Sequence, residues 1–258
     1  MAALVHYAVD GPVARITLDS PHNRNALSSA LVDQLHRRLS DAAEESGVRA
    51  VVLGHTGATF CAGADLSEAS GGDAFDAAAD RARQLTALLR AILELPLPVV
   101  GAIDGHVRAG GLGLVGACDI VVAGRQSTFA LTEVRIGVAP GIISLTLLPK
   151  IAARAAGRFF LTGQKFGADE AAAIGLVTMA TDDVAASVGG ITADLGRGSP
   201  QGLAASKALT TQPILEEFDR RAEELTVQSA KLFLSDEARE GMLAFLQKRP
   251  PRWESEAR

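Results

Sequence analysis

Two glycine-containing loops could present main-chain amides to a ligand, because each follows an aliphatic stretch typical of a buried strand. The first loop spans residues 60–66 and follows 51–53, and the second spans 105–113 and follows 99–103. Small residues let the backbone approach a bound molecule closely. Two N–H groups that converge at the start of a helix would stabilise negative charge developing on an oxygen atom. The loops therefore predict a site for a reaction that passes through an oxyanion.

The second loop does not have the pattern of a nucleotide-binding site. No G-x-G-x-x-G spacing is present in it, and no P-loop lysine follows it. A dinucleotide-binding or P-loop site is therefore not predicted.

The elements that must position these loops alternate between short strands and helices. Aliphatic and β-branched runs predict strands, and Asp10-Gly11 predicts a tight hairpin between the first two. Ser28 is a suitable N-cap for the first helix, and Pro96 ends the second. The predicted strands are 4–9, 13–18, 50–53, 99–103, 120–123 and 176–179, the second helix is 74–95, and residues 54–65 are expected to form a loop.

This alternation predicts an α/β fold in which parallel strands are joined by crossover connections. Nearly everything from Ile142 onward has a helical pattern. The helical remainder, roughly residues 200–258, is too thin to hold a core alone. We expect it to pack against the main domain or a second subunit.

Composition and charge restrict the function. The 258 residues are 48% hydrophobic, 21% charged and 4% aromatic, with a formal net charge of −5. A globular protein with an aliphatic core is expected, and nucleic acid is not expected as a partner because phosphate binding needs a basic surface. Cys61 and Cys118 form no CxxC pair, so neither a disulfide framework nor a metal site is predicted. No apolar stretch is long enough to cross a bilayer, and a cytoplasmic protein is expected.

Ordered motifs along the whole chain give the most specific signal. In order, the chain resembles the enoyl-CoA hydratase/isomerase (crotonase) family in residues 16–21 with 24–28, 60–66, 105–120, 129–137 with 140–141, 161–163 with 175–177, and 235–241 with Phe245 and 248–250. The resemblance implies a crotonase-like ββα superhelical spiral over residues 1–198. It also implies a C-terminal helical segment, residues 199–258, that takes part in oligomerisation as a homotrimer or a dimer of trimers.

The resemblance also implies roles for three residues. Ala64 and Gly110 match the two main-chain N–H donors that bind the thioester carbonyl of an acyl-CoA substrate. Glu133 matches one of two glutamates that hydratases of the family direct at C2 and C3. Losing one such amide donor costs about 10²–10³ in rate in other enzymes, and a positioned acid/base contributes about 10²–10⁴.

The second family glutamate falls at Gly113 and is absent. An enoyl-CoA hydratase that uses Glu133 for both proton steps is the preferred interpretation, with a branched substrate such as 3-methylglutaconyl-CoA as one option. A Δ3,Δ2-enoyl-CoA isomerase, which manages with one glutamate, is an alternative. A catalytically silent acyl-CoA-binding protein is another.

The same resemblance implies a binding site for the coenzyme A part of the substrate, and no separate cofactor. The residues matched to it are Arg24, Ala26, Ala62, Asp65 and Leu66, with Phe245 and Lys248 reaching the nucleotide end, often from a neighbouring subunit. The segment 67–73 is expected to shape the acyl pocket.

Several of these residues have an ordinary structural role as an alternative. Glu133 could pair with Arg135 at the surface, and Phe245 could belong to the core. His106 is expected to have a structural or gating role, and Arg108 is expected to face solvent rather than to bind a second carboxylate on the substrate.

Overall fold

The computed structural model describes residues 3–68 and 74–256, and these residues form two sheets. The larger is six-stranded in the order β1-β2-β3-β5-β7-β10, and the smaller is four-stranded in the order β4-β6-β8-β9. The larger comprises β1 (Val5–Asp10), β2 (Val13–Leu18), β3 (Ala50–His55), β5 (Val99–Ile103), β7 (Ile120–Gly124) and β10 (Met179–Thr181). The smaller comprises β4 (Thr59–Cys61), β6 (His106–Arg108), β8 (Thr128–Ala130) and β9 (Phe166–Gly167).

Most neighbouring strands are parallel, as expected. Only the β1–β2 and β8–β9 pairs are antiparallel among the described strands. The passes β3–β4–α2, β5–β6–α3 and β7–β8–α4 each give one strand to the larger sheet, one to the smaller, and then a helix. This repetition is the predicted ββα spiral.

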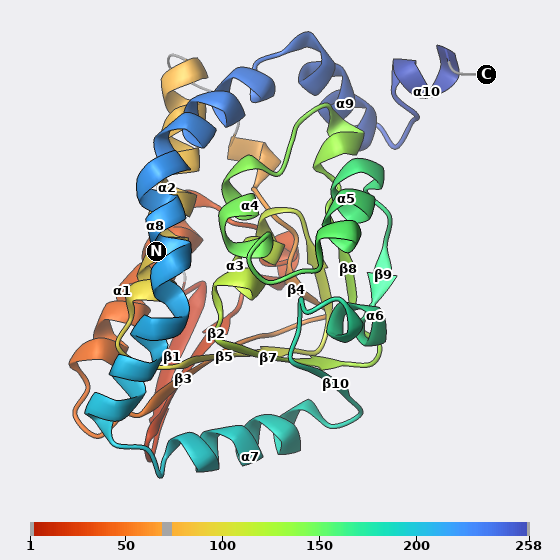
Figure 1. Ribbon diagram of the computed structural model, residues 1–258. Helices are drawn as coiled ribbons and strands as arrows, with labels where there is room; N and C mark the ends of the chain where they lie inside the picture. Colours follow the sequence, from red (N-terminus) through yellow and green to blue (C-terminus); the bar gives the residue numbers. More distant parts are fainter. Residues whose placement is uncertain (1–2, 69–73, 257–258) are drawn as a thin grey trace.

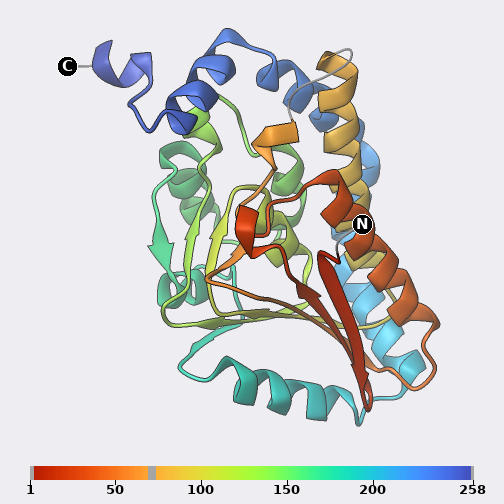
Figure 2. The ribbon, with the colours of Figure 1, turned by 180° about the vertical axis from the view of Figure 1, so that it is seen from behind.

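The helices cover both faces of the six-stranded sheet. In Figures 1 and 2, α7 lies on one side of this sheet, and α2, α3 and α4 lie on the other. The helices are α1 (Ser29–Glu44), α2 (Ala74–Glu94), α3 (Gly110–Ala117), α4 (Gly141–Leu147), α5 (Ala153–Thr162), α6 (Ala168–Ala173), α7 (Val184–Leu195), α8 (Pro200–Phe233), α9 (Asp236–Leu246) and α10 (Arg252–Glu256). Among the described residues, three 3₁₀ turns each lie between a strand and the helix that follows it. They are η1 (Pro21–Asn23), η2 (Leu66–Glu68) and η3 (Glu133–Ile136).

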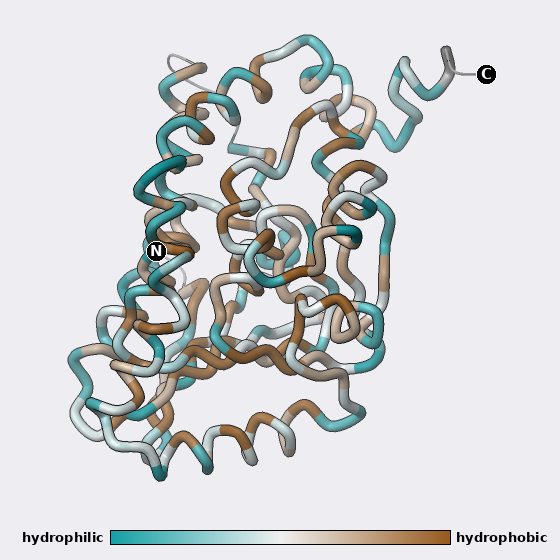
Figure 3. The backbone as a smooth tube through the Cα atoms, viewed as in Figure 1, coloured by the Kyte–Doolittle hydropathy of each residue, from teal (hydrophilic) through white to brown (hydrophobic). Residues whose placement is uncertain are grey.

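The core is aliphatic, as the scarcity of aromatic residues predicts. Figure 3 shows hydrophobic residues concentrated along the strands of the larger sheet. Both cysteines are buried, and burial raises the pKa of each thiol to about 12. They therefore serve as packing residues rather than as nucleophiles.

Several predicted elements are confirmed and others need correction: the predicted second loop, residues 105–113, contains β6 and the start of α3. The hairpin turns at Gly11 with φ +54°, and the Ser28 side chain accepts a hydrogen bond from the Leu31 amide as the N-cap of α1. The expected loop over 54–65 contains β4, a strand too short to produce a sequence pattern, which pairs only with the distant β6. The last predicted strand begins at Met179 rather than Leu176.

Helix α8 packs against α2 and α4 of the same chain. On α8, the Lys207 side chain is 3% exposed, and its Nζ donates to the carbonyl oxygens of Ile92 at 2.7 Å and Leu97 at 3.0 Å. It also lies 2.9 Å from the Asp119 carboxylate, which accepts the Val99 amide at 2.7 Å. One ammonium group thus joins α8 to the end of α2 and to the edge of the larger sheet.

Replacing Lys207 with alanine should strongly destabilise the protein. The substitution leaves the Asp119 charge and two carbonyl groups without their cation, and breaking a buried pair costs about 3–5 kcal/mol. We expect a fall of that size in the free energy of unfolding measured with urea. Lys231→Ala, an exposed position on the same helix, should change it by less than about 0.5 kcal/mol. Equal effects for the two variants would contradict this role.

Candidate functional site

The two glycine-containing loops meet because their strands pair. Strands β4 and β6 are parallel neighbours, with Thr59 opposite His106. A Cβ atom added to Gly63 would lie 2.8 Å from the Ala109 Cβ and 3.2 Å from the Gly110 nitrogen. A Cβ atom added to Gly110 would lie 3.7 Å from the Ala64 nitrogen. The main-chain amides of Ala64 and Gly110 are therefore neighbours.

Helix α3 begins directly against the first loop. A Cβ atom on Gly111 would lie 2.8 Å from both the Cβ and the carbonyl oxygen of Cys61, a contact that real side chains do not make. Glycine at position 111 thus lets the first turn of the helix touch β4. Ala109, just before the helix, has φ +47°, and a positive φ in a residue other than glycine is a strained conformation that often marks a functional site.

The two neighbouring amides have no acceptor within residues 3–68 and 74–256. Among the described residues, none accepts a hydrogen bond from the amide of Ala64 or of Gly110. Ala64 is exposed and Gly110 is half-buried. The arrangement can therefore donate two hydrogen bonds to one oxygen atom of a ligand, at the positive end of α3.

Glu133 reaches the same region through β8. The Ala109 amide donates to the Ala130 carbonyl at 3.1 Å, so the end of β8 lies beside the start of α3. Glu133 follows three residues later as the first residue of η3. The strand pairing therefore brings the carboxyl-bearing turn to the edge at which the two amides lie.

The Glu133 carboxyl group is buried without a countercharge. Its residue is 8% exposed, and Oε2 has no hydrogen-bond partner within the described part of the chain. Burial raises the pKa of Glu133 from 4.5 to about 7, while a hydrogen bond from its own main-chain amide acts in the opposite direction. The alternative of a surface ion pair with Arg135 is wrong, because a buried side chain cannot form one. A carboxyl group with a pKa near 7 can both accept and donate a proton at neutral pH.

The position of the missing second glutamate is filled by apolar side chains. A Cβ atom on Gly113 would lie 2.5 Å from Ile143 Cγ2 and 3.2 Å from Leu89 Cδ1. Ile143 belongs to α4 and is 2% exposed. A glutamate at position 113 would need Ile143 to move, so the absence of the second carboxylate is built into the packing of α3 against α4 and α2.

The residues expected near coenzyme A gather around η1 and the first loop. The Ala62 amide donates to the Arg24 carbonyl at 3.1 Å, and Asn23 donates to the Asp65 carboxylate at 3.0 Å. Ala26 is buried, and Leu66 is half-buried at the start of η2. Hydrogen bonds from Ser67 and Asn23 lower the pKa of Asp65. Of the segment expected to shape the acyl pocket, residues 69–73 lie outside the described residues.

Asn25 is a site residue that the sequence analysis did not single out. Its buried side chain accepts the Ser20 amide at 2.6 Å and donates to the carbonyl oxygens of Thr56 and Thr59 at 3.1 and 2.8 Å. It thereby fixes η1 to the strand that carries the first loop. The only signal was its place in the Arg24-Asn25-Ala26 motif.

Phe245 and Lys248 are not linked to the coenzyme A residues within this chain. Phe245 is 55% exposed, so the alternative that it belongs to the core is wrong. Lys248 is exposed with φ +54° just after α9. Among the described residues, neither side chain makes a hydrogen bond or ion pair with η1 or the first loop.

Arg108 and His106 have structural partners. The Arg108 guanidinium donates to the carbonyl oxygens of Val107 at 2.8 Å and Thr128 at 2.7 Å, and to the Thr128 hydroxyl at 2.8 Å. Because this side chain is half-buried, the expectation that it faces solvent is wrong. His106 Nδ1 lies 3.0 Å from the same Thr128 hydroxyl, so both residues tie β6 to β8.

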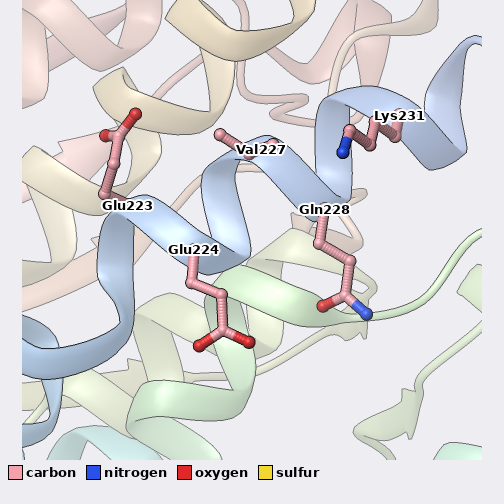
Figure 4. Close-up of a pocket in the computed structure, with 5 residues that line it drawn as sticks. All are labelled: Glu223, Glu224, Val227, Gln228 and Lys231. Carbon is pink, nitrogen blue, oxygen red and sulfur yellow. The ribbon is translucent and has the colours of Figure 1, made fainter.

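Other features do not form a competing site. A cavity of about 440 Å³ is lined by Glu223, Glu224, Val227, Gln228 and Lys231, all on α8 and none among the predicted site residues (Figure 4). Within residues 3–68 and 74–256, no cluster of three or more His, Cys, Asp or Glu side chains is arranged to hold a metal ion. No helix in these ranges combines the length and the apolar character that a membrane span requires.

Comparisons with known proteins identify the family of the chain. The family described as Enoyl-CoA hydratase/isomerase matches residues 9–256. A crystal structure of an enoyl-CoA hydratase from Mycobacterium avium is 65% identical, with a TM-score of 0.92 over 98% of this chain and 100% of that one. The 2,3-dehydroadipyl-CoA hydratase of Escherichia coli is 31% identical over 93% of this chain and 94% of its own length, and the carnitinyl-CoA dehydratase of Salmonella typhi is 29% identical over 98% and 99%. The chain belongs to the enoyl-CoA hydratase/isomerase family.

Proposed function

We propose that this protein is an enoyl-CoA hydratase that adds water across the C2–C3 double bond of a 2-enoyl-CoA thioester. The observation that carries the proposal is a single buried carboxyl group with a pKa of about 7, on a turn next to two main-chain amides that lack partners. No cofactor is needed beyond the coenzyme A of the substrate itself.

In the proposed mechanism, the amides of Ala64 and Gly110 bind the thioester oxygen. The Glu133 carboxylate takes a proton from water as the hydroxide oxygen bonds to C3, and the electrons of the double bond move to form an enolate on the bound oxygen. The protonated Glu133 then gives its proton to C2, which restores the thioester carbonyl. One residue thus returns to its starting state after adding H and OH, and both of its protonation states are accessible near pH 7.

Arg108 does not restrict the charge of the acyl chain. Its guanidinium donates three hydrogen bonds to Val107 and Thr128, whereas a guanidinium has five N–H donors. The proposed substrates therefore include straight, branched and dicarboxylic acyl chains, 3-methylglutaconyl-CoA among them. The relatives act on varied acyl groups, as the names dehydroadipyl and carnitinyl indicate, so a substrate panel is the direct test.

A Δ3,Δ2-enoyl-CoA isomerase is the second candidate. Ile143 fills the space beside Gly113 that a second, water-holding carboxylate would need. A single carboxyl group suffices to remove a proton from C2 and return it to C4. A silent acyl-CoA-binding protein remains the non-catalytic alternative, and it leaves the raised pKa of Glu133 without a use.

Self-association is part of the proposal. Leu243, Phe245 and Leu246 of α9 are 45%, 55% and 65% exposed. A homotrimer or a dimer of trimers would cover such side chains, and a neighbouring subunit could then bring Phe245 and Lys248 to the nucleotide end of coenzyme A.

The reaction and the role of Glu133 can be tested together. We expect crotonyl-CoA to lose its conjugated thioester absorbance in the presence of the enzyme, and Glu133→Gln to lower kcat by about 10²–10⁴. Glu224→Gln, on the exposed face of α8, is the matched control and should retain full activity. Appearance of that absorbance from a 3-enoyl-CoA, with no hydration of crotonyl-CoA, would establish the isomerase. Acyl-CoA binding without turnover in either assay would establish the silent protein.

Gly113 and Ile143 offer a test of the one-carboxylate site. Gly113→Glu alone should lower the free energy of unfolding by about 3 kcal/mol or more, because the new side chain overlaps Ile143 and its charge enters an apolar core. Adding Ile143→Ala makes room, and the double variant should hydrate crotonyl-CoA at least about tenfold faster than Ile143→Ala alone. If Gly113→Glu is as stable as the unchanged protein by urea unfolding, the steric account is wrong.

The raised pKa of Glu133 should also appear in the stability of the protein. The folded state binds this proton more tightly than the unfolded state, so the contribution is fully present below pH 4.5 and is lost as the pH rises through about 7. The Gln variant lacks this loss. Relative to the unchanged protein, it should therefore gain about 2–3 kcal/mol in unfolding free energy between pH 5 and pH 8. If the difference in unfolding free energy between Glu133→Gln and the unchanged protein were the same at pH 5 and pH 8, the Glu133 carboxyl group would be ionised over that whole range.

A further inference from the structure

The motif at residues 235–241 has no part in the proposed chemistry, yet it forms the helix that packs on η3. A Cβ atom on Gly241 of α9 would lie 2.6 Å from both the Cα and the carbonyl carbon of Ile136. A Cβ atom on Gly137 would lie 2.7 Å from the carbonyl carbon of Glu237 and 2.8 Å from the Ala238 nitrogen. The backbones of α9 and η3 are thus in direct contact from both sides, with no room for a methyl group on either glycine.

This contact lies at the end of the turn that holds the catalytic carboxyl group. The Gly137 amide, at φ +76°, donates to the Glu133 carbonyl, and the Val138 amide donates to the same oxygen at 3.1 Å. Glu133 and the residues touched by α9 are therefore one hydrogen-bonded unit. Any displacement of Ile136 or Gly137 must move the Glu133 backbone.

Hydrogen bonds stabilise α9 itself. The Ser235 hydroxyl caps its N-terminus by accepting the Ala238 amide at 3.1 Å. Near the middle of the helix, the Glu240 side chain is 10% exposed and receives two hydrogen bonds at 2.6 and 3.0 Å from Arg249, which follows the helix. The backbone packing at Gly241 and Gly137 joins this ordered helix to η3.

We propose that Gly241 is a positioning residue for catalysis: by allowing α9 to touch the backbone of η3, it fixes Glu133 relative to the amides of Ala64 and Gly110. The role of Gly241 in catalysis rests on the proposed function, in which Glu133 transfers the proton. It predicts that the C-terminal helix contributes to proton transfer within its own chain.

Charged groups around η3 do not explain a change in the titration of Glu133 when α9 moves. Glu237 on α9, Arg154 on α5 and Arg135 on η3 itself are exposed. The remaining charged side chains on the elements packed against η3 have partners of their own: Arg239 with Asp236, Glu240 with Arg249, and Arg158 with Glu170. Burial raises the pKa of Glu133. A shift of α9 would therefore change this pKa by moving the Glu133 carboxyl group and altering how deeply it is buried.

The test is Gly241→Ala, with Gly157→Ala as the matched control. Both glycines lie in helices that pack on η3, but a Cβ atom on Gly157 would meet nothing within 4 Å. We expect Gly241→Ala to lower kcat at least about tenfold, to leave KM within about twofold, and to shift the pH–rate profile. Gly157→Ala should match the unchanged enzyme in all three. A lower Tm for Gly241→Ala with an unaltered kcat and pH profile would overturn the proposal, as would equal losses in both variants.

Ala238→Gly provides a milder perturbation if Gly241→Ala does not fold. Ala238 is fully buried at the same contact, and removing its methyl group loosens α9 without a clash. We expect a smaller fall in kcat with the same shift in pH profile, and an unchanged profile would overturn the proposal.

A spectroscopic measurement separates this inference from the proposed function. The infrared band of the protonated Glu133 carboxyl group, assigned by its loss in Glu133→Gln, should titrate at a different pH in Gly241→Ala and at the normal pH in Gly157→Ala. This outcome would support the positioning role even in a protein that turns over no enoyl-CoA. The role would be refuted if the band titrated at the same pH in the unchanged protein, in Gly241→Ala and in Gly157→Ala.

Discussion

The site depends on direct contact between stretches of main chain, which is possible only where a side chain is absent. Gly63 and Gly111 let the first loop touch the start of α3, and Gly241 lets α9 touch η3. At each place an added Cβ atom would lie within 2.8 Å of a neighbouring atom. Main-chain amides can converge on one oxygen only if their backbones approach this closely, so the glycines determine the geometry of the site.

Rigid packing also explains how an uncompensated carboxyl group is kept in the interior. No described residue supplies a countercharge to Glu133, and its burial opposes folding whenever the group is ionised. Burial of the apolar side chains in the main hydrophobic core offsets this cost. An exposed carboxyl group would avoid the cost, but its pKa would be near 4.5 and it would rarely carry a proton to donate at neutral pH.

The sequence predicted most of the strands and the parallel connections between them. These features follow from local patterns, such as the aliphatic runs and the Ser28 cap, or from ordered motifs. It did not predict β4, because three residues carry no periodicity, or the partners of Arg108, because a guanidinium bound to Thr128 depends on the pairing of β6 with β8. The contact between α9 and η3 was likewise hidden. Gly241 was visible as a motif residue, but its neighbour Ile136 lies about a hundred positions earlier in the chain.

The same packing argument bears on why the site holds one carboxyl group. The residues that exclude a side chain at Gly113 are Ile143 and Leu89, which come from α4 and α2 and belong to the main hydrophobic core. A carboxylate there would require the side chains of Ile143 and Leu89 to move, whereas the Glu133 position requires only the short turn η3. A charge at position 113 would also enter an apolar environment and oppose folding, as the ionised Glu133 does.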